Sequence, residues 1–288
     1  MCGIFGFLGA RQNALDLPTL KKIALVTEAR GKHAFGWAWV SKDGHIHSYK
    51  MPGEISKHMN LLDMVKDAEV VIGHTRWATH GDPKDNANNH PFACDGGWLV
   101  HNGIVSNYAA LANENEIVLQ SECDSEIIAA LAERSNAATV LDRMADAIAQ
   151  TNPGPLAVAA LWARPTRLVI AKRGNPLSFG RTRGGSIYFA SLPTGLPGTV
   201  KPVGQESIYS FELVSWRKDN GKVRSRKAYA NNRNSHFFRT KGSAESCGPL
   251  FECASESNRS DGPRRLVQSE GRWEGKTVAD GNGHQEEE

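Results

Sequence analysis

The amino-terminal stretch Met1-Cys2-Gly3-Ile4-Phe5-Gly6-Phe7-Leu8-Gly9 places a cysteine directly after the initiator methionine. Cysteine is small enough for Met1 to be removed, and removal leaves one residue that carries both a thiol and an α-amino group. An α-amino group titrates near pH ~8, so it can accept the thiol proton and later deliver it to a leaving amine. Cys2 is therefore a candidate nucleophile with its own base. In the alternative interpretation, Cys2 is only a small apolar residue that begins a strand over residues 4–8.

The apolar pattern beyond this stretch predicts strands, then helices, then strands again. The first part contains a helix at 17–28, a hairpin of 36–41 with 45–50, a helical turn at 63–68 and a strand at 70–74. A strand at 98–101 is expected to end in a turn at Asn102-Gly103, and helices follow at 108–114, 125–134 and 140–150. An antiparallel meander is expected from the β-rich segments 156–162, 167–172, 186–191 and 208–213. This order predicts an α+β fold in which helices cover sheets.

The composition favours one sizeable core with its ligand in a pocket. The 288 residues have 40% hydrophobic content and a formal net charge of +3, which is too near balance to favour nucleic acid or a membrane as the main partner. The chain shows neither a secretory signal pattern nor an apolar run long enough to span a bilayer, so a cytoplasmic protein is expected. Its five cysteines contain no CxxC pair, which favours neither a disulfide framework nor a zinc site.

The apolar periodicity fades after residue 215. Residues 217–241 hold nine Lys or Arg against one acid, and the remainder is rich in Ser, Gly, Asn and Glu. Such a composition buries too little apolar surface to offset the entropy of ordering the chain. We therefore expect a folded domain over 2–215 and a polar, basic-then-acidic tail over 216–288 that is largely disordered. The basic run is either a solvated tail or a docking segment for an acidic partner.

Several segments occur in an order that resembles a known family. They are MCGIFGFLG, Arg30-Gly31, GHTRWATHG (73–81), NNHPF (88–92), LVHNGIVSNY (99–108) and SECDSE (121–126). The set resembles the glutaminase domain of class II glutamine amidotransferases, and within that class the domain of glutamine:fructose-6-phosphate aminotransferase. Residues 173–177, Gly180 and Ala190-Ser191 extend the resemblance to about residues 2–195. The fold that it implies is the four-layer αββα sandwich of N-terminal-nucleophile hydrolases.

The resemblance also implies the catalytic residues. Cys2 corresponds to the family's nucleophile, and the oxyanion hole falls on the Asn102 side chain and the Gly103 backbone N–H. Such donors suit a tetrahedral intermediate, whose negative charge they can meet without reorganising. Without the flanking motifs, Asn102-Gly103 would be interpreted as an ordinary hairpin turn.

The substrate glutamine is expected to be held by its amino-acid end. By resemblance, Arg76 binds the α-carboxylate and Asp124 the α-ammonium group, which suits the planar fork of arginine and the charge of aspartate. Thr79 and His80 correspond to substrate-contacting loop residues, and Trp77 to an aromatic lid. Asp124 can equally act as a helix N-cap.

The same region is rich in histidine. His74, His90 and His101 show no metal-binding spacing, so we expect packing roles and no metal, and no phosphate-loop or dinucleotide motif predicts a cofactor. One departure from the family is His33, which stands where the pattern Arg-Gly-x-Asp-x-x-Gly has its acidic residue. Because of this departure, the packing of the loop near the site is expected to differ from that of the family, whereas the expected chemistry is unchanged.

These observations predict an amidotransferase that hydrolyses glutamine and supplies ammonia to an acceptor, expected on a separate synthase because the 288 residues leave no room for a sugar-binding domain. Two alternatives remain open. One is an N-terminal-nucleophile amidohydrolase acting on another amide or a γ-glutamyl compound. The other is a non-catalytic binding module with the same fold.

Overall fold

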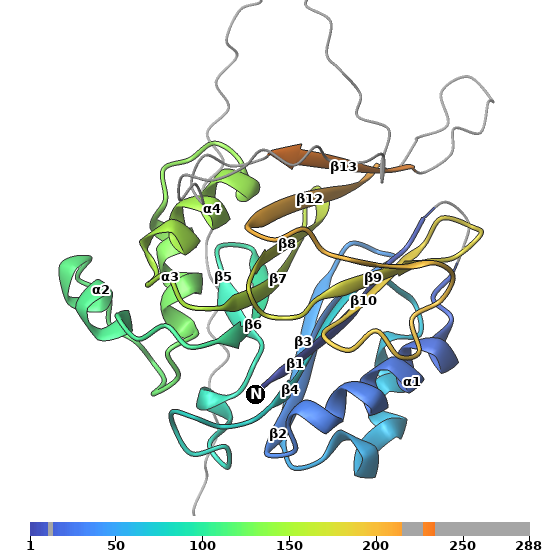
Figure 1. Cartoon of the computed structure of the whole chain (residues 1–288), viewed down its shortest axis with the longest axis horizontal. Helices are drawn as coiled ribbons and strands as arrows, with labels where there is room; N and C mark the ends of the chain where they lie inside the picture. Colours follow the sequence, from blue (N-terminus) through green and yellow to red (C-terminus); the bar gives the residue numbers. More distant parts are fainter. Residues whose placement is uncertain (11–13, 215–226, 234–288) are drawn as a thin grey trace, which may run out of the picture. The chain divides into compact units, whose positions relative to one another are not determined.

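The computed structural model of the chain describes residues 1–10, 14–214 and 227–233 (Figure 1). Its helices are α1 (Leu17–Thr27), α2 (Tyr108–Glu114), α3 (Glu126–Arg134) and α4 (Val140–Gln150), with 3₁₀ segments η1 (Glu28–Arg30), η2 (Ile55–Val65) and η3 (Asn86–Asn88). Its strands are β1 (Gly3–Leu8), β2 (Ala34–Ser41), β3 (Ile46–Pro52), β4 (Ala68–Arg76), β5 (Phe92–Cys94), β6 (Gly97–Gly103), β7 (Leu156–Ala163), β8 (Thr166–Arg173), β9 (Ser178–Arg181), β10 (Ile187–Ala190), β11 (Val200–Pro202), β12 (Ser207–Val214) and β13 (Lys227–Arg233).

The strands form two antiparallel sheets. One has the order β11-β9-β10-β1-β4-β2-β3 and the other the order β13-β12-β8-β7-β6-β5. Strands β1 and β10 are far apart in the sequence but are neighbours in the first sheet, since Phe5 pairs with Ala190 and Leu8 with Ile187. The amino terminus therefore lies in the middle of a sheet, between β10 and β4.

Alternating side chains of the strands divide the interior into layers. Phe5 and Phe7 of β1 pack with the buried face of α1 and with η2, whereas Ile4 and Leu8 point to the other side and pack against β7 and β8. The second sheet does the same, because Leu99, Val158 and Val169 pack under α3 and α4. Successive side chains of a strand point to opposite faces, so one cluster lies between the sheets and one on each outer face. The α+β sandwich with the layer order αββα is confirmed.

Local sequence signals place the covering helices. Asp16 caps α1, where its carboxylate accepts hydrogen bonds from the Thr19 N–H and hydroxyl, and Pro18 occupies the first turn. Thr139 caps α4 through its hydroxyl, which accepts the Asp142 N–H at 3.1 Å. The apolar face of α4 is buried on the second sheet.

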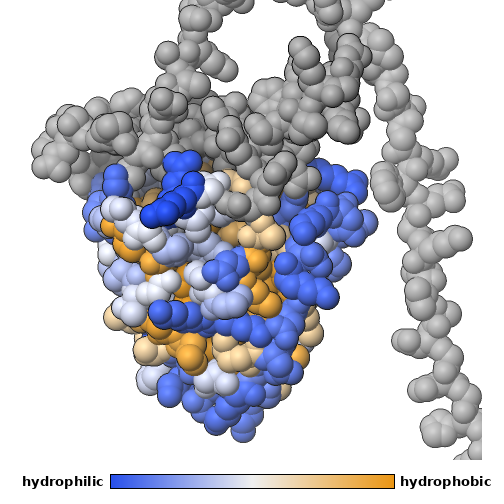
Figure 2. Space-filling view, turned by 90° about the vertical axis from the view of Figure 1, so that its right-hand side faces the viewer, coloured by the Kyte–Doolittle hydropathy of each residue, from blue (hydrophilic) through white to orange (hydrophobic). Residues whose placement is uncertain are grey.

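Figure 2 shows the flank of the molecule that lies to the right in Figure 1. Apolar patches lie in the middle of this face, and hydrophilic residues lie among them and along its edges. Exposed large apolar side chains such as Leu25 and Val200 are common on globular proteins and by themselves indicate no partner.

The structure corrects four expectations about the elements. The helical turn expected at 63–68 is part of the longer η2, and Ala68 already belongs to β4. The expected meander is wrong, because β10 leaves it and pairs with β1 in the other sheet while β7, β8 and β12 remain neighbours. The order along the sequence suggested that β10 lies between β8 and β12. Strand β10 instead pairs with one edge of β1, and β4 pairs with the other. The third correction concerns elements that were not predicted, which are the 3₁₀ segment η3 and the short strands β5, β9 and β11.

The fourth correction concerns Asn102 and Gly103, which form no turn. Strand β6 continues through both, and they pair with Ala157 and Leu156 of β7. Strand β13 lies in the segment expected to be a tail, and its backbone pairs with β12 from Val214–Lys227 to Ile208–Arg233. The other residues of 216–288 lie outside the described part of the chain, so the boundary at 215 stays a prediction.

Candidate active site

The two sheets bring the amino terminus, β4 and β6 together at one end. Gly3 pairs with Thr75 and Ile4 with His74 on β4. His74 then crosses to the other sheet, where its Nε2 donates to the His101 carbonyl at 2.9 Å. Cys2, Arg76 and Asn102 each stand one residue beyond these contacts, so they lie at the same end of the sandwich, where the amino terminus is marked in Figure 1.

The Cys2 sulfur is held by the backbone of one residue. Its Sγ accepts the Trp77 N–H at 3.4 Å and lies 3.5 Å from the Trp77 carbonyl oxygen, to which the thiol donates. The Cys2 carbonyl accepts the Arg30 Nε–H at 2.7 Å. Met1, the residue that processing must remove, is 71% exposed.

Two glycines allow this close approach. A Cβ on Gly3 would lie 2.4 Å from the Thr27 methyl group, and a Cβ on Gly31 would lie 2.4 Å from the Arg76 carbonyl carbon and 2.5 Å from the Trp77 nitrogen. Residues 30 and 31 therefore both position the backbone around Cys2. Arg30 binds the Cys2 carbonyl, and the missing side chain of Gly31 lets the Arg76–Trp77 backbone pass close to residue 31.

Electrostatics at the sulfur act in both directions. Burial raises the pKa of the Cys2 thiol, whereas the Trp77 backbone hydrogen bond, the positive chain terminus and Arg76 lower it. Asp124 raises the same pKa by its negative charge. Arg76 and Asp124 are thus both near enough to act on the sulfur. Because the net effect is a raised pKa, the group at neutral pH is a thiol that needs a base to ionise.

Asn102 presents an unpaired donor. Its residue is 2% exposed, and its side-chain Nδ2 has no hydrogen-bond partner among the residues that the structure describes. Its backbone is fixed, because the Asn175 amide donates to the Asn102 carbonyl at 2.7 Å and β7 pairs with it on the other side. A buried donor without a partner costs free energy unless a ligand uses it.

Arg76 is buried and anchors the loop that follows it. Its guanidinium donates to Asn89 Oδ1 at 2.9 Å, to the Gly81 carbonyl at 3.2 Å and to the His80 carbonyl. These contacts use three of the five N–H donors that a guanidinium carries. A carboxylate ligand can therefore use only the N–H donors of Arg76 that the loop after this residue leaves available.

Asp124 is 2% exposed and joins two segments of the site. Its Oδ2 accepts the N–H of Val105, two residues after Gly103, at 2.6 Å, and its Oδ1 lies 3.8 Å from the Cys123 sulfur. The cap residue of α3 is Ser125 and makes no side-chain cap bond. The hydrogen bond of Asp124 thus goes to a distant segment, and the helix-cap interpretation is wrong.

The remaining loop residues surround the mouth of the site. Trp77 is 49% exposed, and its ring lies 4.6 Å from the His33 ring. Thr79 is exposed and is 3.3 Å from His80 Nδ1, and the His80 ring is 6.0 Å from Tyr108. Among the described residues, neither Thr79 nor His80 is hydrogen-bonded to Cys2.

Three buried histidines lie beneath the site. The ring centroids of His74 and His90 lie 3.9 Å apart with an interplanar angle of 30°, and His101 Nδ1 is 2.8 Å from the Ser125 hydroxyl. Burial lowers the pKa of His74 to about 3 and that of His101 to about 4, and it lowers the pKa of His90 well below the usual value. No group of three His, Cys, Asp or Glu suited to a metal occurs within the described residues.

Several residues that support the candidate site had no role predicted from the sequence. Arg30 binds the Cys2 carbonyl, Asn175 holds the Asn102 strand, and the Ser191 hydroxyl accepts the Ile4 N–H at 2.9 Å beside Cys2. All three stand in the segments that carry the resemblance, which was the available signal. Asn89, which binds Arg76, stands in such a segment too.

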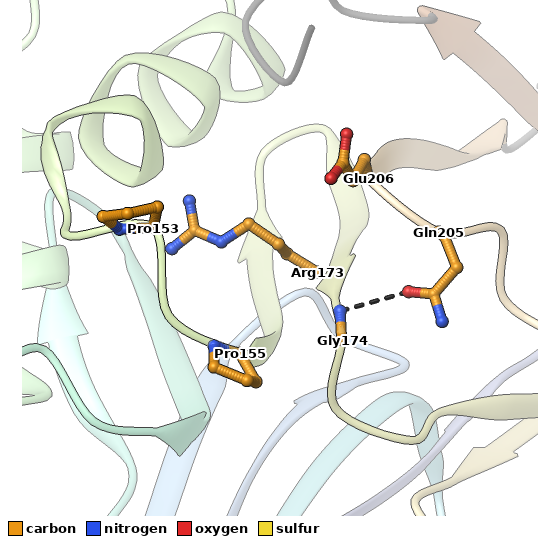
Figure 3. A pocket seen from close by; sticks show the side chains of 6 residues that line it. All are labelled: Pro153, Pro155, Arg173, Gly174, Gln205 and Glu206. Atoms are coloured by element: carbon orange, nitrogen blue, oxygen red, sulfur yellow. Dashed lines mark hydrogen bonds between the residues drawn. The ribbon is translucent and has the colours of Figure 1, made fainter. Parts of the chain in front are cut away.

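A shallow cavity of about 390 Å³ lies beside Asn175, the residue that binds the Asn102 carbonyl (Figure 3). Pro153, Pro155, Arg173, Gly174, Gln205 and Glu206 line it. Figure 3 shows the Gly174 N–H donating to Gln205 Oε1, at 3.1 Å. The Arg173 guanidinium donates to the 151–154 segment, to the carbonyls of Asn152 and Gly154. None of the predicted site residues lines this cavity. The candidate active site is therefore the group of side chains around Cys2 and not this cavity.

Similarity to known proteins gives the class of this domain, which is a glutamine amidotransferase domain. Residues 74–197 match the family of the glutamine amidotransferase domain. Among solved structures, the fold is similar to glutamine phosphoribosylpyrophosphate amidotransferase from B. subtilis, with a TM-score of 0.62 and 22% identity over 80% of this chain and 49% of that chain. A glutamine aminotransferase class-II domain protein from Silicibacter pomeroyi has a TM-score of 0.53 at 14% identity, over 80% of this chain and 99% of that one.

Curated relatives narrow the assignment. The glutamine–fructose-6-phosphate aminotransferase of Chlorobaculum tepidum is 35% identical over 62% of this chain and 30% of its own length, and that of Aquifex aeolicus is 35% identical over 70% and 34%. The chain thus spans about a third of the length of these relatives. It carries a class II glutamine amidotransferase domain. In the described part of the chain, no helix is long and apolar enough to cross a membrane.

Proposed function

We propose that this chain hydrolyses the side-chain amide of glutamine through a thioester on Cys2 and delivers the ammonia to an acceptor on a separate synthase. The observation that carries the proposal is the arrangement around the sulfur. A thiol held by the Trp77 backbone stands at the end of β1 with Arg76 and Asp124 nearby, and Asn102 presents a buried donor at the matching end of β6.

The first step is activation of the thiol. Removal of Met1 gives Cys2 a free amine, which takes the thiol proton while Sγ attacks the amide carbon of glutamine. The carbonyl oxygen becomes an oxyanion, and the Asn102 amide and the Gly103 N–H stabilise it. This use of Asn102 satisfies a buried donor that has no partner among the described residues.

The intermediate then collapses. The carbon–nitrogen bond breaks, the Cys2 ammonium returns its proton to the leaving nitrogen, and ammonia departs from the thioester. Water activated by the same amine adds to the thioester carbon, the carbon–sulfur bond breaks, and glutamate leaves with the thiol restored. The chemistry needs neither a metal nor a cofactor.

Glutamine is held at its other end by opposite charges. The Asp124 carboxylate binds the α-ammonium group while Val105 keeps that carboxylate oriented. Arg76 binds the α-carboxylate with donors that its loop contacts do not use. Thr79 and His80 complete the loop around the substrate, and Trp77 covers it.

The test is a glutamate-release assay on protein whose amino-terminal residue has been verified by mass spectrometry. Cys2→Ala should abolish turnover, whereas Cys94→Ala, which removes another buried thiol, should preserve it. Arg76→Lys keeps the charge but loses the planar fork, so it should raise KM strongly. Turnover of γ-glutamyl compounds or other amides in preference to glutamine supports the alternative amidohydrolase, and the absence of all turnover in processed protein supports a binding module.

The acceptor is proposed on another chain because ammonia released into solvent is lost by protonation. We also propose a cytoplasmic location, since a free cysteine nucleophile requires a reducing compartment. We further propose a folded domain over 2–215, to which β13 adds an edge strand, with a tail over the rest of 216–288. A pull-down with the full chain and with 2–215, followed by glutaminase assays with the captured protein, tests the partnership. Full turnover without any captured synthase would refute it.

A further inference from the structure

We infer that His33 is a positioning residue for the Cys2 nucleophile and that it acts by accepting the amide proton of Ala78. This inference rests on the proposed glutaminase function. The contact is a hydrogen bond of 3.0 Å from the Ala78 N–H to His33 Nδ1. Because a backbone N–H can only donate, Nδ1 carries the lone pair and the ring proton is on Nε2.

One peptide group connects this contact to the nucleophile. The carbonyl of Trp77 and the N–H of Ala78 belong to the same planar unit and point in opposite directions. The carbonyl end faces the Cys2 sulfur at 3.5 Å, and the N–H end faces His33 at 3.0 Å. Fixing the N–H therefore fixes the direction of the carbonyl that accepts the Cys2 thiol. The Trp77 N–H, which donates to the same sulfur at 3.4 Å, belongs to the preceding peptide group.

His33 is itself fixed to the sheet. Its N–H donates to the Arg76 carbonyl at 3.0 Å, and its own carbonyl accepts the Gly53 N–H at 2.9 Å, which extends the pairing of β2 with β4 and β3 by one residue. Its ring also lies 4.6 Å from the Trp77 ring at an interplanar angle of 32°. One side chain on a rigid strand end thus holds both the peptide and the indole beside Cys2.

Two substitutions separate the hydrogen bond from the ring contact. His33→Asn keeps an acceptor near the Nδ1 position and removes the ring, whereas His33→Phe keeps a ring and removes the acceptor. A matched control is His47, which stacks on Trp39 at 4.9 Å on the same hairpin but far along it from Cys2. His47→Phe should leave every measurement below unchanged.

The measurements are kcat and KM for glutamine, and the rate at which iodoacetamide alkylates the amino-terminal peptide, followed by mass spectrometry. We expect His33→Phe to lower kcat and to change the alkylation rate by about tenfold, the usual effect of one hydrogen bond, with KM within about threefold. His33→Asn should restore both rates to within about threefold. His33→Ala replaces the Phe variant if that variant does not fold, as judged by circular dichroism.

Equal losses in His33→Asn and His33→Phe would assign the effect to the ring and overturn the acceptor role. Unchanged kcat and alkylation in both would overturn the positioning role altogether. If the wild-type protein lacks glutaminase activity, the proposed function fails, but the alkylation rates of Cys2 still decide the role of His33.

Discussion

Acid should unfold this chain through the three histidines buried beneath the site. His74, His90 and His101 are at most 2% exposed, and burial lowers the pKa of His74 to about 3 and that of His101 to about 4. In the unfolded chain each imidazole returns to a pKa of about 6.5. Below that pH the unfolded state binds more protons than the folded state, so the free energy of unfolding falls as the pH falls.

The size of the effect follows from these shifts. Between about pH 7 and about pH 5, each histidine that stays neutral in the fold removes about 2 kcal/mol, and the three together about 5–6 kcal/mol. Small domains are stable by about 5–15 kcal/mol in total. The loss continues until the pH reaches the folded-state pKa values, and below them these groups contribute no further change.

Urea unfolding at several pH values, monitored by circular dichroism, measures this loss directly. His90→Phe preserves a ring between His74 and Phe92 and removes one titrating group, so its loss between the same pH values should be smaller by about 2 kcal/mol. A free energy of unfolding that stays constant from pH 7 to pH 5 would refute the reasoning. So would an unchanged pH slope in His90→Phe.

Four further predictions concern the site. Cys2→Ser should leave less than about a hundredth of glutaminase turnover, because a hydroxyl ionises far less readily than a thiol; comparable turnover would contradict thioester chemistry. Asn102→Ala should lower kcat by about a hundredfold with little change in KM, and an effect confined to KM would assign Asn102 to ground-state binding. Asp124→Asn keeps an acceptor for Val105 and should raise KM at least about tenfold, while deaminated glutamine analogues should bind the wild type poorly in competition assays. Gly31→Ala should lower thermal stability by about 1–3 kcal/mol, because its Cβ would lie 2.4 Å from the Arg76 carbonyl carbon; an unchanged melting temperature would show that the backbone yields easily.

Much of the candidate site could be proposed from the sequence because its residues stand in short segments with distinct chemistry. Cys2 after Met1, the Asn102-Gly103 pair and the Arg30-Gly31 pair can all be found by local inspection. The α+β class followed from the order of strands and helices, and the hairpin of β2 and β3 from its Asp43-Gly44 turn. Such features depend on neighbouring residues, which a sequence displays directly.

Long-range pairing was beyond local inspection. The residues around Ile187 do not indicate that β10 pairs with β1. Strands β8 and β12 offer the same backbone hydrogen bonds, so the local sequence cannot select among the three partners. Asn102-Gly103 has the composition of a turn, but pairing with β7 keeps it in a strand. Tertiary contacts outweighed local preference in both cases.

Sequence alone therefore determined which residues are available for the chemistry, and the tertiary structure decided how each is used. The sequence shows an arginine at position 76, but only the fold shows that its guanidinium holds the loop at His80 and Gly81. It shows a histidine in place of an acidic residue at position 33, but only the fold shows that this ring accepts the Ala78 N–H behind the nucleophile. The physical reason is that a hydrogen bond requires a particular distance and direction between groups far apart along the chain, and those are set only when the sheets pack.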